Sequence, residues 1–127
     1  MDLIEVVCGL IFQEDKVFIC RRKAGKHLEG YWEFPGGKLN EGEVKEQALI
    51  RELQEELAMK VHIGAYLGYN DHSYSNKRIR LHAIKCELIS YEGLLIDHDS
   101  AEWTKPDNLK NFKLAPADIP LVKYLPS

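Results

Sequence analysis

The sequence predicts one α+β domain built around a mixed β-sheet. Three observations support this prediction: apolar β-branched runs, an amphipathic segment between them, and short helical segments near the C-terminus. The 127 residues are 45% hydrophobic and 29% charged, as in an ordinary globular protein. No internal repeat, linker or low-complexity tract divides the chain. We therefore expect a single domain over residues 1–127.

The first expected element is a β-hairpin. Residues 4–12 and 17–20 are apolar and mostly β-branched, and the polar residues 14–16 between them favour a turn. A polar loop follows over residues 24–30. The first strand is expected to be largely buried, because its apolar run is nearly continuous.

A turn and a helix are expected next. After the aromatic residues 31–34, Pro35-Gly36-Gly37 is a strong turn signal. From 44 to 57 the sequence changes to a helical period among good helix formers, which predicts an amphipathic helix. The apolar positions that carry this period are Ala48, Leu49, Leu53 and Leu57.

The remaining expected elements are strands and short helices. Residues 61–69 and 79–88 have the composition of strands, separated by the polar segment 70–77. Glu102-Trp103 is expected to end another short strand. Short helices are expected at 106–109 and 118–125, where Pro120 is tolerated in the first turn.

Composition bounds the partners and the compartment. With 17 Lys+Arg against 20 Asp+Glu, the net charge of −3 argues against a nucleic-acid polymer as partner. An acidic protein that handles phosphates needs a metal cation to mediate. Cys8, Cys20 and Cys86 form no CxxC pair and are expected to be buried free thiols in a reducing compartment. Without a signal peptide or an apolar run of about 20 residues, we expect a cytoplasmic protein with no membrane partner.

The most informative segment is the predicted helix with its acidic residues. Glu52, Glu55 and Glu56 are spaced i, i+3 and i+4, so their carboxylates share one helix face. Like charges at this spacing destabilise a helix, whereas a hard divalent cation among them reverses the effect. The alternative is a solvated acidic face balanced by Arg51 and Lys45.

The residues before the helix favour the cation. Gly36-Gly37 permits unusual backbone conformations and places a carbonyl or N–H against a ligand, and Lys38 offers an ammonium to a phosphate. The whole spacing is Gly37, five residues, Glu43, seven residues, Arg51-Glu52-Leu53, one residue, Glu55-Glu56. This pattern resembles the signature of the Nudix hydrolases.

The resemblance extends along most of the chain. The segments WEFPGGK, EW at Glu102-Trp103 and LAPADIPL at 114–121 resemble the MutT-like branch of the family, and most of all its members that hydrolyse cytidine triphosphates. One position departs from the signature, because Ala58 stands where the family usually has Gly. If that position requires a positive φ, Ala costs about 1 kcal/mol relative to Gly.

The resemblance implies both a fold and an activity. The Nudix fold is a mixed β-sheet between helices, an α/β/α sandwich. The implied enzyme is a Mg²⁺- or Mn²⁺-dependent nucleoside triphosphate pyrophosphohydrolase that releases a nucleoside monophosphate and pyrophosphate. Its substrates are of the CTP or 5-methyl-dCTP type, or oxidised nucleotides of the 8-oxo-dGTP type, which implies nucleotide-pool sanitation. The expected partner is a small nucleotide, and the protein is a monomer or a homodimer.

The resemblance also assigns roles to individual residues. Metal ligands would be Glu52, Glu55, Glu56, the Gly36 carbonyl, and a distal acid at Asp97 or Asp99. Arg51 would steady the glutamates, and Glu52 would orient or deprotonate the attacking water. The nucleotide would be contacted by Lys38 at a phosphate, Arg22 at the ribose or base, Phe34 by stacking, and Asp118 at the base edge.

Several of these residues have a plainer alternative. Asp97 also suits a loop turn, Asp118 a helix N-cap, Phe34 a core position and Arg22 a solvated strand end. His98 is expected to be an exposed loop residue.

Other functions are kept open. A catalytically inactive module that only binds damaged nucleotides is a different class, and the intact Glu52, Glu55 and Glu56 argue against it. Diadenosine polyphosphate hydrolases of the family carry a Tyr near Tyr74, and ADP-ribose hydrolases carry a Pro near Ser75. The diadenosine polyphosphate specificity therefore retains some support, whereas the ADP-ribose specificity has little.

Overall fold

The structure, a computed structural model, describes residues 2–126. Its elements in chain order are β1 (Leu3–Gln13), β2 (Lys16–Arg22), β3 (Trp32–Glu33), β4 (Gly36–Lys38), α1 (Lys45–Leu57), β5 (Lys60–Tyr74), β6 (Lys77–Ser90), β7 (His98–Thr104), and the 3-10 helices η1 (Pro106–Asn111) and η2 (Ile119–Tyr124). No helix in this described part is long and apolar enough to cross a membrane.

The strands form one mixed sheet in the order β3-β2-β1-β6-β5, with β4 added to β1 and β7 added to β2. The pairing of β1 with β6 is parallel, from Leu3 opposite Arg78 to Phe12 opposite Glu87. All the other strand pairs are antiparallel. The sheet is therefore mixed, as the sequence predicts.

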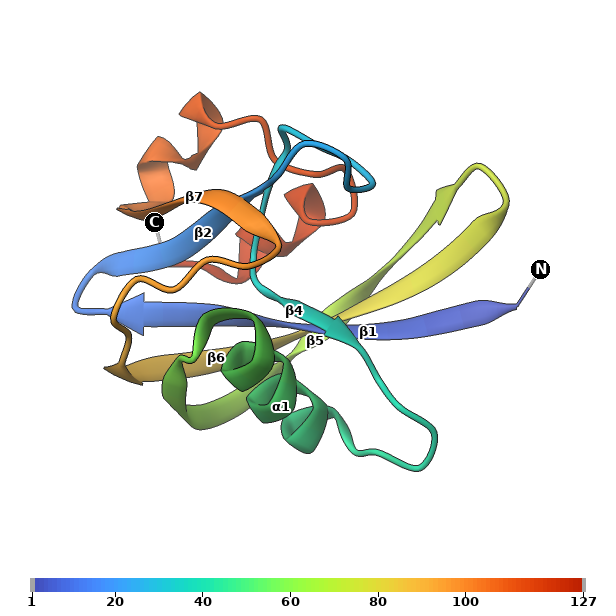
Figure 1. Cartoon of the computed structure of the whole chain (residues 1–127), viewed down its shortest axis with the longest axis horizontal. Helices are drawn as coiled ribbons and strands as arrows, with labels where there is room; N and C mark the ends of the chain where they lie inside the picture. The colour runs from blue at the N-terminus through green and yellow to red at the C-terminus, as the bar shows by residue number, and fades with distance from the viewer. Residues whose placement is uncertain (1, 127) are drawn as a thin grey trace.

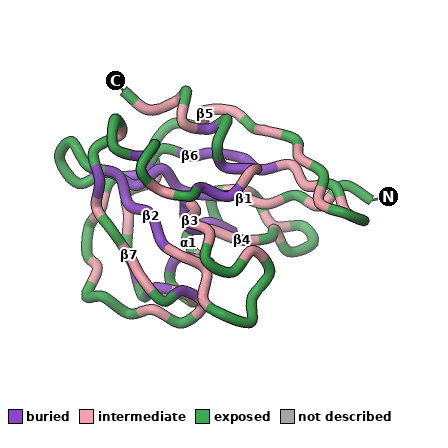
Figure 2. The backbone as a smooth tube through the Cα atoms, turned by 90° about the horizontal axis from the view of Figure 1, so that it is seen from above, coloured by how far each residue is buried: buried purple, intermediate pink, exposed green. Residues whose placement is uncertain are grey.

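Two hydrophobic clusters occupy opposite faces of this sheet. Alternate residues of β1 divide between them: Val7 and Ile11 pack under α1, whereas Leu10 and Phe12 pack towards η1 and η2. In Figure 1 the green α1 and the orange and red C-terminal turns lie on opposite sides of the blue strands. Figure 2 shows the most buried stretches along β1, β2 and β6. The α/β/α arrangement is confirmed, with 3-10 turns forming the second outer layer.

The amphipathic helix and the thiols agree with their predictions. α1 buries Ala48, Leu49, Leu53 and Leu57 against the sheet. All three cysteines are free and buried. At the end of the helix Ala58 has φ 49° and ψ 38°, and its N–H donates to the Gln54 carbonyl. The position does require a left-handed backbone, so the alanine is strained there.

Two expectations about loops are wrong. Residues 70–77 do not separate two strands, because β5 and β6 continue through them as a hairpin closed at Ser75, which has φ 42°. The polar side chains suit this exposed ladder: Arg80 donates to both carboxylate oxygens of Asp71, at 2.8 and 3.0 Å. Gly36-Gly37 is not a turn either, since both residues lie in β4 and pair with β1.

Candidate active site

Arg51 connects the acidic helix to the segments that precede it. Its Nε and Nη2 each donate to one carboxylate oxygen of Glu43 at 2.9 Å, a two-point ionic contact. Its Nη1 donates to Glu52 at 2.7 Å and to Glu55 at 3.3 Å. Its Nη2 also donates to the carbonyl of Lys38 at 3.0 Å. One guanidinium therefore fixes α1 against both β4 and the loop after it.

Glu43 is held in its ionised form. Hydrogen bonds from Arg51, and then from the Asn40 backbone N–H at 2.9 Å, lower the pKa of Glu43 to about 2. The same contacts, with those to Glu52, raise the pKa of Arg51 above its already high value. This arrangement gives Glu43 a structural role, because it holds Arg51 beside the acidic residues of α1.

Glu56 meets Asp97, which lies just before β7. A hydrogen bond between the two carboxyls is among the causes that shift the pKa of each. Burial, followed by this bond and the charge of Glu52, raises the pKa of Glu56 to about 9. The bond to Glu56 lowers the pKa of Asp97, and Lys26 supports this at 3.1 Å from its Oδ1. The pair thus shares one proton across the gap between helix and strand.

The chemistry of this carboxyl pair fits a divalent cation. Glu56 Oε2 is buried and has no hydrogen-bond partner within residues 2–126. A bound cation would supply a partner for that oxygen and take the place of the shared proton, and an all-oxygen donor set suits Mg²⁺ or Mn²⁺. Asp99 is engaged elsewhere, 2.7 Å from Arg21 Nε. The geometry therefore favours Asp97 over Asp99 as the distal acid.

The three helix glutamates are not drawn to a single point. Within the described chain their ligand oxygens do not all lie within 4.8 Å of one another. Glu52 and Glu55 both turn to Arg51, and the Glu55 side chain is 60% exposed, whereas Glu56 faces Asp97. Mutual repulsion of the carboxylates favours this separation.

Both glycines of β4 are required by close approach rather than by a positive φ. A Cβ on Gly36 would lie 1.9 Å from the Val7 carbonyl oxygen of β1. A Cβ on Gly37 would lie 2.4 Å from Cδ and Oε2 of Glu52. The first glycine thus permits strand pairing, and the second makes room for a carboxylate of the site. This is a different reason for the glycines from the turn that the sequence indicates.

A pocket of about 210 Å³ is lined by all three residues of β4, of which Gly37 also lies against Glu52. It brings together all four residues expected to contact the nucleotide, which are Arg22, Phe34, Lys38 and Asp118. Its apolar wall comes from the first half of β1 and from Ile79 and Leu81 of β6. A partly apolar pocket with few polar groups is typical of a small-molecule site.

Asp118 is buried and lines this pocket. Its Oδ2 accepts a hydrogen bond from the Phe34 N–H at 2.9 Å, and its side chain does not cap η2. Burial, together with the charge of Glu33, raises the pKa of Asp118. Asp118 thus occupies the N-cap position of η2 without a capping hydrogen bond from its side chain, whereas Phe34 both belongs to the core and lines the pocket.

Sequence reasoning missed Glu33 and misjudged His98. His98 is 3% exposed, and its Nε2 lies 2.7 Å from Oε2 of Glu33, so the expectation of an exposed histidine is wrong. Glu33 also lines the pocket, where its Oε2 is 3.6 Å from Arg22. No local signal marks either residue, because the two are 65 positions apart and meet only through β2, the neighbour of both β3 and β7.

Comparison with known sequences points to one family. The family model described as the NUDIX domain matches residues 6–124. The chain is 37% identical over 125 residues to a CTP pyrophosphohydrolase of Escherichia coli, covering 97% of this chain and 91% of that protein. It is 30% identical over 126 residues to an 8-oxo-dGTP diphosphatase of the same organism, covering 98% of each chain.

Comparison with solved structures agrees. The solution structure of the Escherichia coli ORF135 protein is similar with a TM-score of 0.81 and 36% identity, covering 98% of this chain and 89% of that one. A MutT protein from Methanosarcina mazei has a TM-score of 0.83 at 21% identity, covering 96% of this chain and 89% of that one. The second similarity concerns the fold alone.

Proposed function

The chain belongs to the Nudix hydrolase family, and on that premise we propose that it is a Mg²⁺-dependent nucleoside triphosphate pyrophosphohydrolase of nucleotide-pool sanitation. It acts on CTP or 5-methyl-dCTP-type nucleotides or on oxidised nucleotides of the 8-oxo-dGTP type. Relatives named for both activities support this choice. The observation that carries it is the carboxyl pair of Glu56 and Asp97, accompanied by a pocket that all four residues expected to contact the nucleotide line.

Glu52, Glu55, Glu56, Asp97 and the Gly36 carbonyl would hold the divalent cation. When bound, that cation neutralises the triphosphate and lowers the pKa of a water. Nudix enzymes generally use divalent metals, and the oxygen-only donor set favours Mg²⁺ or Mn²⁺ here.

Each nearby residue has a defined part in the reaction. Glu52 orients the attacking water or takes its proton, and Arg51 keeps Glu52 in place through the 2.7 Å contact. The Lys38 ammonium contacts a phosphate. Water adds to a phosphorus of the triphosphate and one P–O–P bridge breaks, so that the products are a nucleoside monophosphate and pyrophosphate.

The pocket holds the nucleoside. Phe34 offers an aromatic face to the base and Arg22 a guanidinium to the ribose or base. Asp118 reads the base edge. In its neutral form the carboxyl donates one hydrogen bond, and in either form it accepts from an exocyclic amino group.

The test is pyrophosphate release with Mg²⁺ from a panel of nucleotides, comparing kcat/KM. CTP, 5-methyl-dCTP, 8-oxo-dGTP and the unmodified nucleotides form the main set. Diadenosine polyphosphates are added for the rival specificity and are followed by separating the adenine nucleotides formed, because their hydrolysis frees no pyrophosphate. We expect the highest kcat/KM with a cytidine or oxidised triphosphate. Release from none of them, with tight nucleotide binding retained, would establish a binding module instead.

A further inference from the structure

We propose that Cys20, Glu33 and His98 form a second metal site, which takes a borderline divalent ion such as Zn²⁺ or Co²⁺. The site is distinct from the carboxylates of α1. It does not depend on the proposed reaction, because it requires neither nucleotide nor Mg²⁺.

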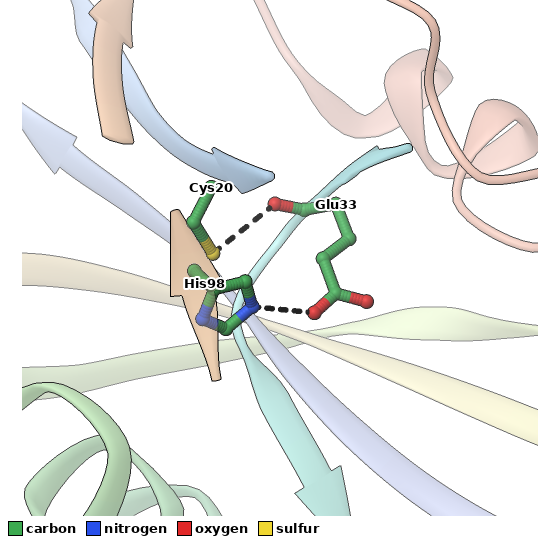
Figure 3. Close-up of side chains that lie close together, drawn as sticks. All are labelled: Cys20, Glu33 and His98. Atoms are coloured by element: carbon green, nitrogen blue, oxygen red, sulfur yellow. Dashed lines mark hydrogen bonds and ion pairs between the residues drawn. The ribbon is translucent and has the colours of Figure 1, made fainter. Parts of the chain in front are cut away.

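The three side chains converge from three strands. Cys20 belongs to β2, Glu33 to β3 and His98 to β7, and Figure 3 shows them facing one another. The sulfur, an imidazole nitrogen and a carboxylate oxygen all lie within 4.8 Å of one another. Among residues 2–126, this is the one group of His, Cys, Asp and Glu that meets this distance.

The donor set selects the class of ion. Thiolate sulfur, imidazole nitrogen and carboxylate oxygen together suit Zn²⁺ or Co²⁺, whereas Mg²⁺ prefers oxygen alone. Ligands bound at about 2.0 to 2.3 Å from one ion are within reach of these atoms after small side-chain shifts. A thiolate from Cys20 and a carboxylate from Glu33 also balance the double charge of the ion, as a buried site requires.

A buried ring nitrogen without a partner independently points to a ligand. Nδ1 of His98 makes no hydrogen bond within the described residues, and the side chain is only 1% exposed. A buried polar atom left unpaired is destabilising. The imidazole therefore has binding capacity that the protein does not use, and its Nε2 already lies 2.7 Å from the Glu33 carboxylate that would bind the same ion.

The ion has an entry path. The Glu33 side chain is 21% exposed and lines the nucleotide pocket, whereas Cys20 and His98 are buried behind it. Burial raises the pKa of the Cys20 thiol, so the thiol is protonated before the ion binds. On binding, the Cys20 proton leaves to solvent and the S–metal bond replaces the S–H bond. Water from the pocket fills any remaining coordination position.

Titration with Co²⁺ in saturating Mg²⁺ tests this site directly. Thiolate-bound Co²⁺ gives a sulfur-to-metal charge-transfer band, which Co²⁺ on carboxylates does not. We expect the band in the unaltered protein, and a loss of affinity of about tenfold or more in Cys20→Ala and His98→Asn. Cys86→Ala is the matched control: it also removes a buried thiol from the core beneath α1, and it should keep the band.

Thermal unfolding provides a second measurement that does not depend on the charge-transfer absorption band. An ion that binds only the folded chain raises Tm. With saturating Mg²⁺ present to fill the carboxylates of α1, Zn²⁺ should raise the Tm of the unaltered protein and of Cys86→Ala but not that of Cys20→Ala. Circular dichroism checks that each variant is folded before titration. Absence of the band in the unaltered protein, or its survival in Cys20→Ala, would overturn the proposal and leave the cluster as a hydrogen-bonded pair beside a thiol.

Discussion

Gly37→Ala tests the geometry of the carboxylate site with a single methyl group. The added Cβ would lie 2.4 Å from Cδ and Oε2 of Glu52 and 2.9 Å from Oε1, whereas ordinary contacts begin near 3.4 Å. The Glu52 carboxylate must therefore move by about 1 Å. That movement disturbs its 2.7 Å hydrogen bond to Arg51 and displaces it from the proposed cation.

The expected result is a loss of activity in a folded protein. A displacement of about 1 Å at a reacting centre costs roughly a hundredfold in rate. The flexible end of Glu52 can yield, so we expect the free energy of unfolding to fall by less than about 1 kcal/mol. The assay measures pyrophosphate release against Mg²⁺ concentration, together with urea denaturation. Half-saturation by Mg²⁺ should move to higher concentration.

Gly36→Ala is the control with the same added methyl group one residue earlier. Its Cβ would lie 1.9 Å from the Val7 carbonyl oxygen and 2.7 Å from the Cys8 Cα, and backbone atoms cannot rotate away. Here β4 must separate from β1, so we expect a loss of stability of about 1 to 3 kcal/mol or more. If Gly37→Ala hydrolyses nucleotide at the original rate with unchanged Mg²⁺ dependence, the placement of Glu52 in the site is refuted.

Three further predictions concern α1. Glu55→Gln should remove most of the pyrophosphate release while circular dichroism and Tm stay unchanged, because the side chain is 60% exposed; turnover near the original rate would contradict its role. Ala58→Gly should raise the free energy of unfolding, measured by urea denaturation, by up to about 1 kcal/mol, because glycine adopts φ 49° without strain. An unchanged free energy of unfolding would mean that the strain at Ala58 is absorbed elsewhere. With a chelator present to remove divalent cations, the free energy of unfolding should fall as pH rises from 5 to 8. The pKa of Glu56 is about 9 in the folded chain and 4.5 in the unfolded chain, so the proton that stabilises the folded chain is lost as pH rises. For one proton the free energy of unfolding can fall by at most about 1.4 kcal/mol per pH unit. Glu56→Gln should reduce this dependence on pH, and an equal dependence in both proteins would refute the shared proton.

Periodicity was enough to predict the parts of the fold that depend on local pattern. The helix at 45–57 and its four buried residues follow from the apolar spacing, and the hairpin of β1 and β2 follows from its two β-branched runs. A left-handed backbone at Ala58 was raised only as a condition, from the glycine that the family usually has there, and the structure meets that condition. In the site, the spacing of Glu52, Glu55 and Glu56 indicated one acidic helix face.

Features that depend on distant residues were not predictable in the same way. The polar segment 70–77 has no apolar alternation, yet it forms strands because each strand has the other as a partner. The burial of His98 depends on Glu33, and the small size of Gly37 is required by Glu52, 15 positions later in the sequence. A turn signal at Gly36-Gly37 and a close approach at the same residues are indistinguishable without the neighbouring strand and helix.

The local arrangement of charge resolves the apparent conflict between an acidic chain and a phosphate substrate. The net charge of −3 counts every carboxylate equally, but those of the site are compensated in two different ways. Arg51 neutralises Glu43 permanently, because both partners stay ionised at any physiological pH. Glu56 and Asp97 are compensated only by a proton, which a divalent cation can replace. A divalent cation at Glu56 and Asp97 can therefore bring positive charge to a triphosphate. The ion pair of Arg51 with Glu43 keeps the helix in position for that cation.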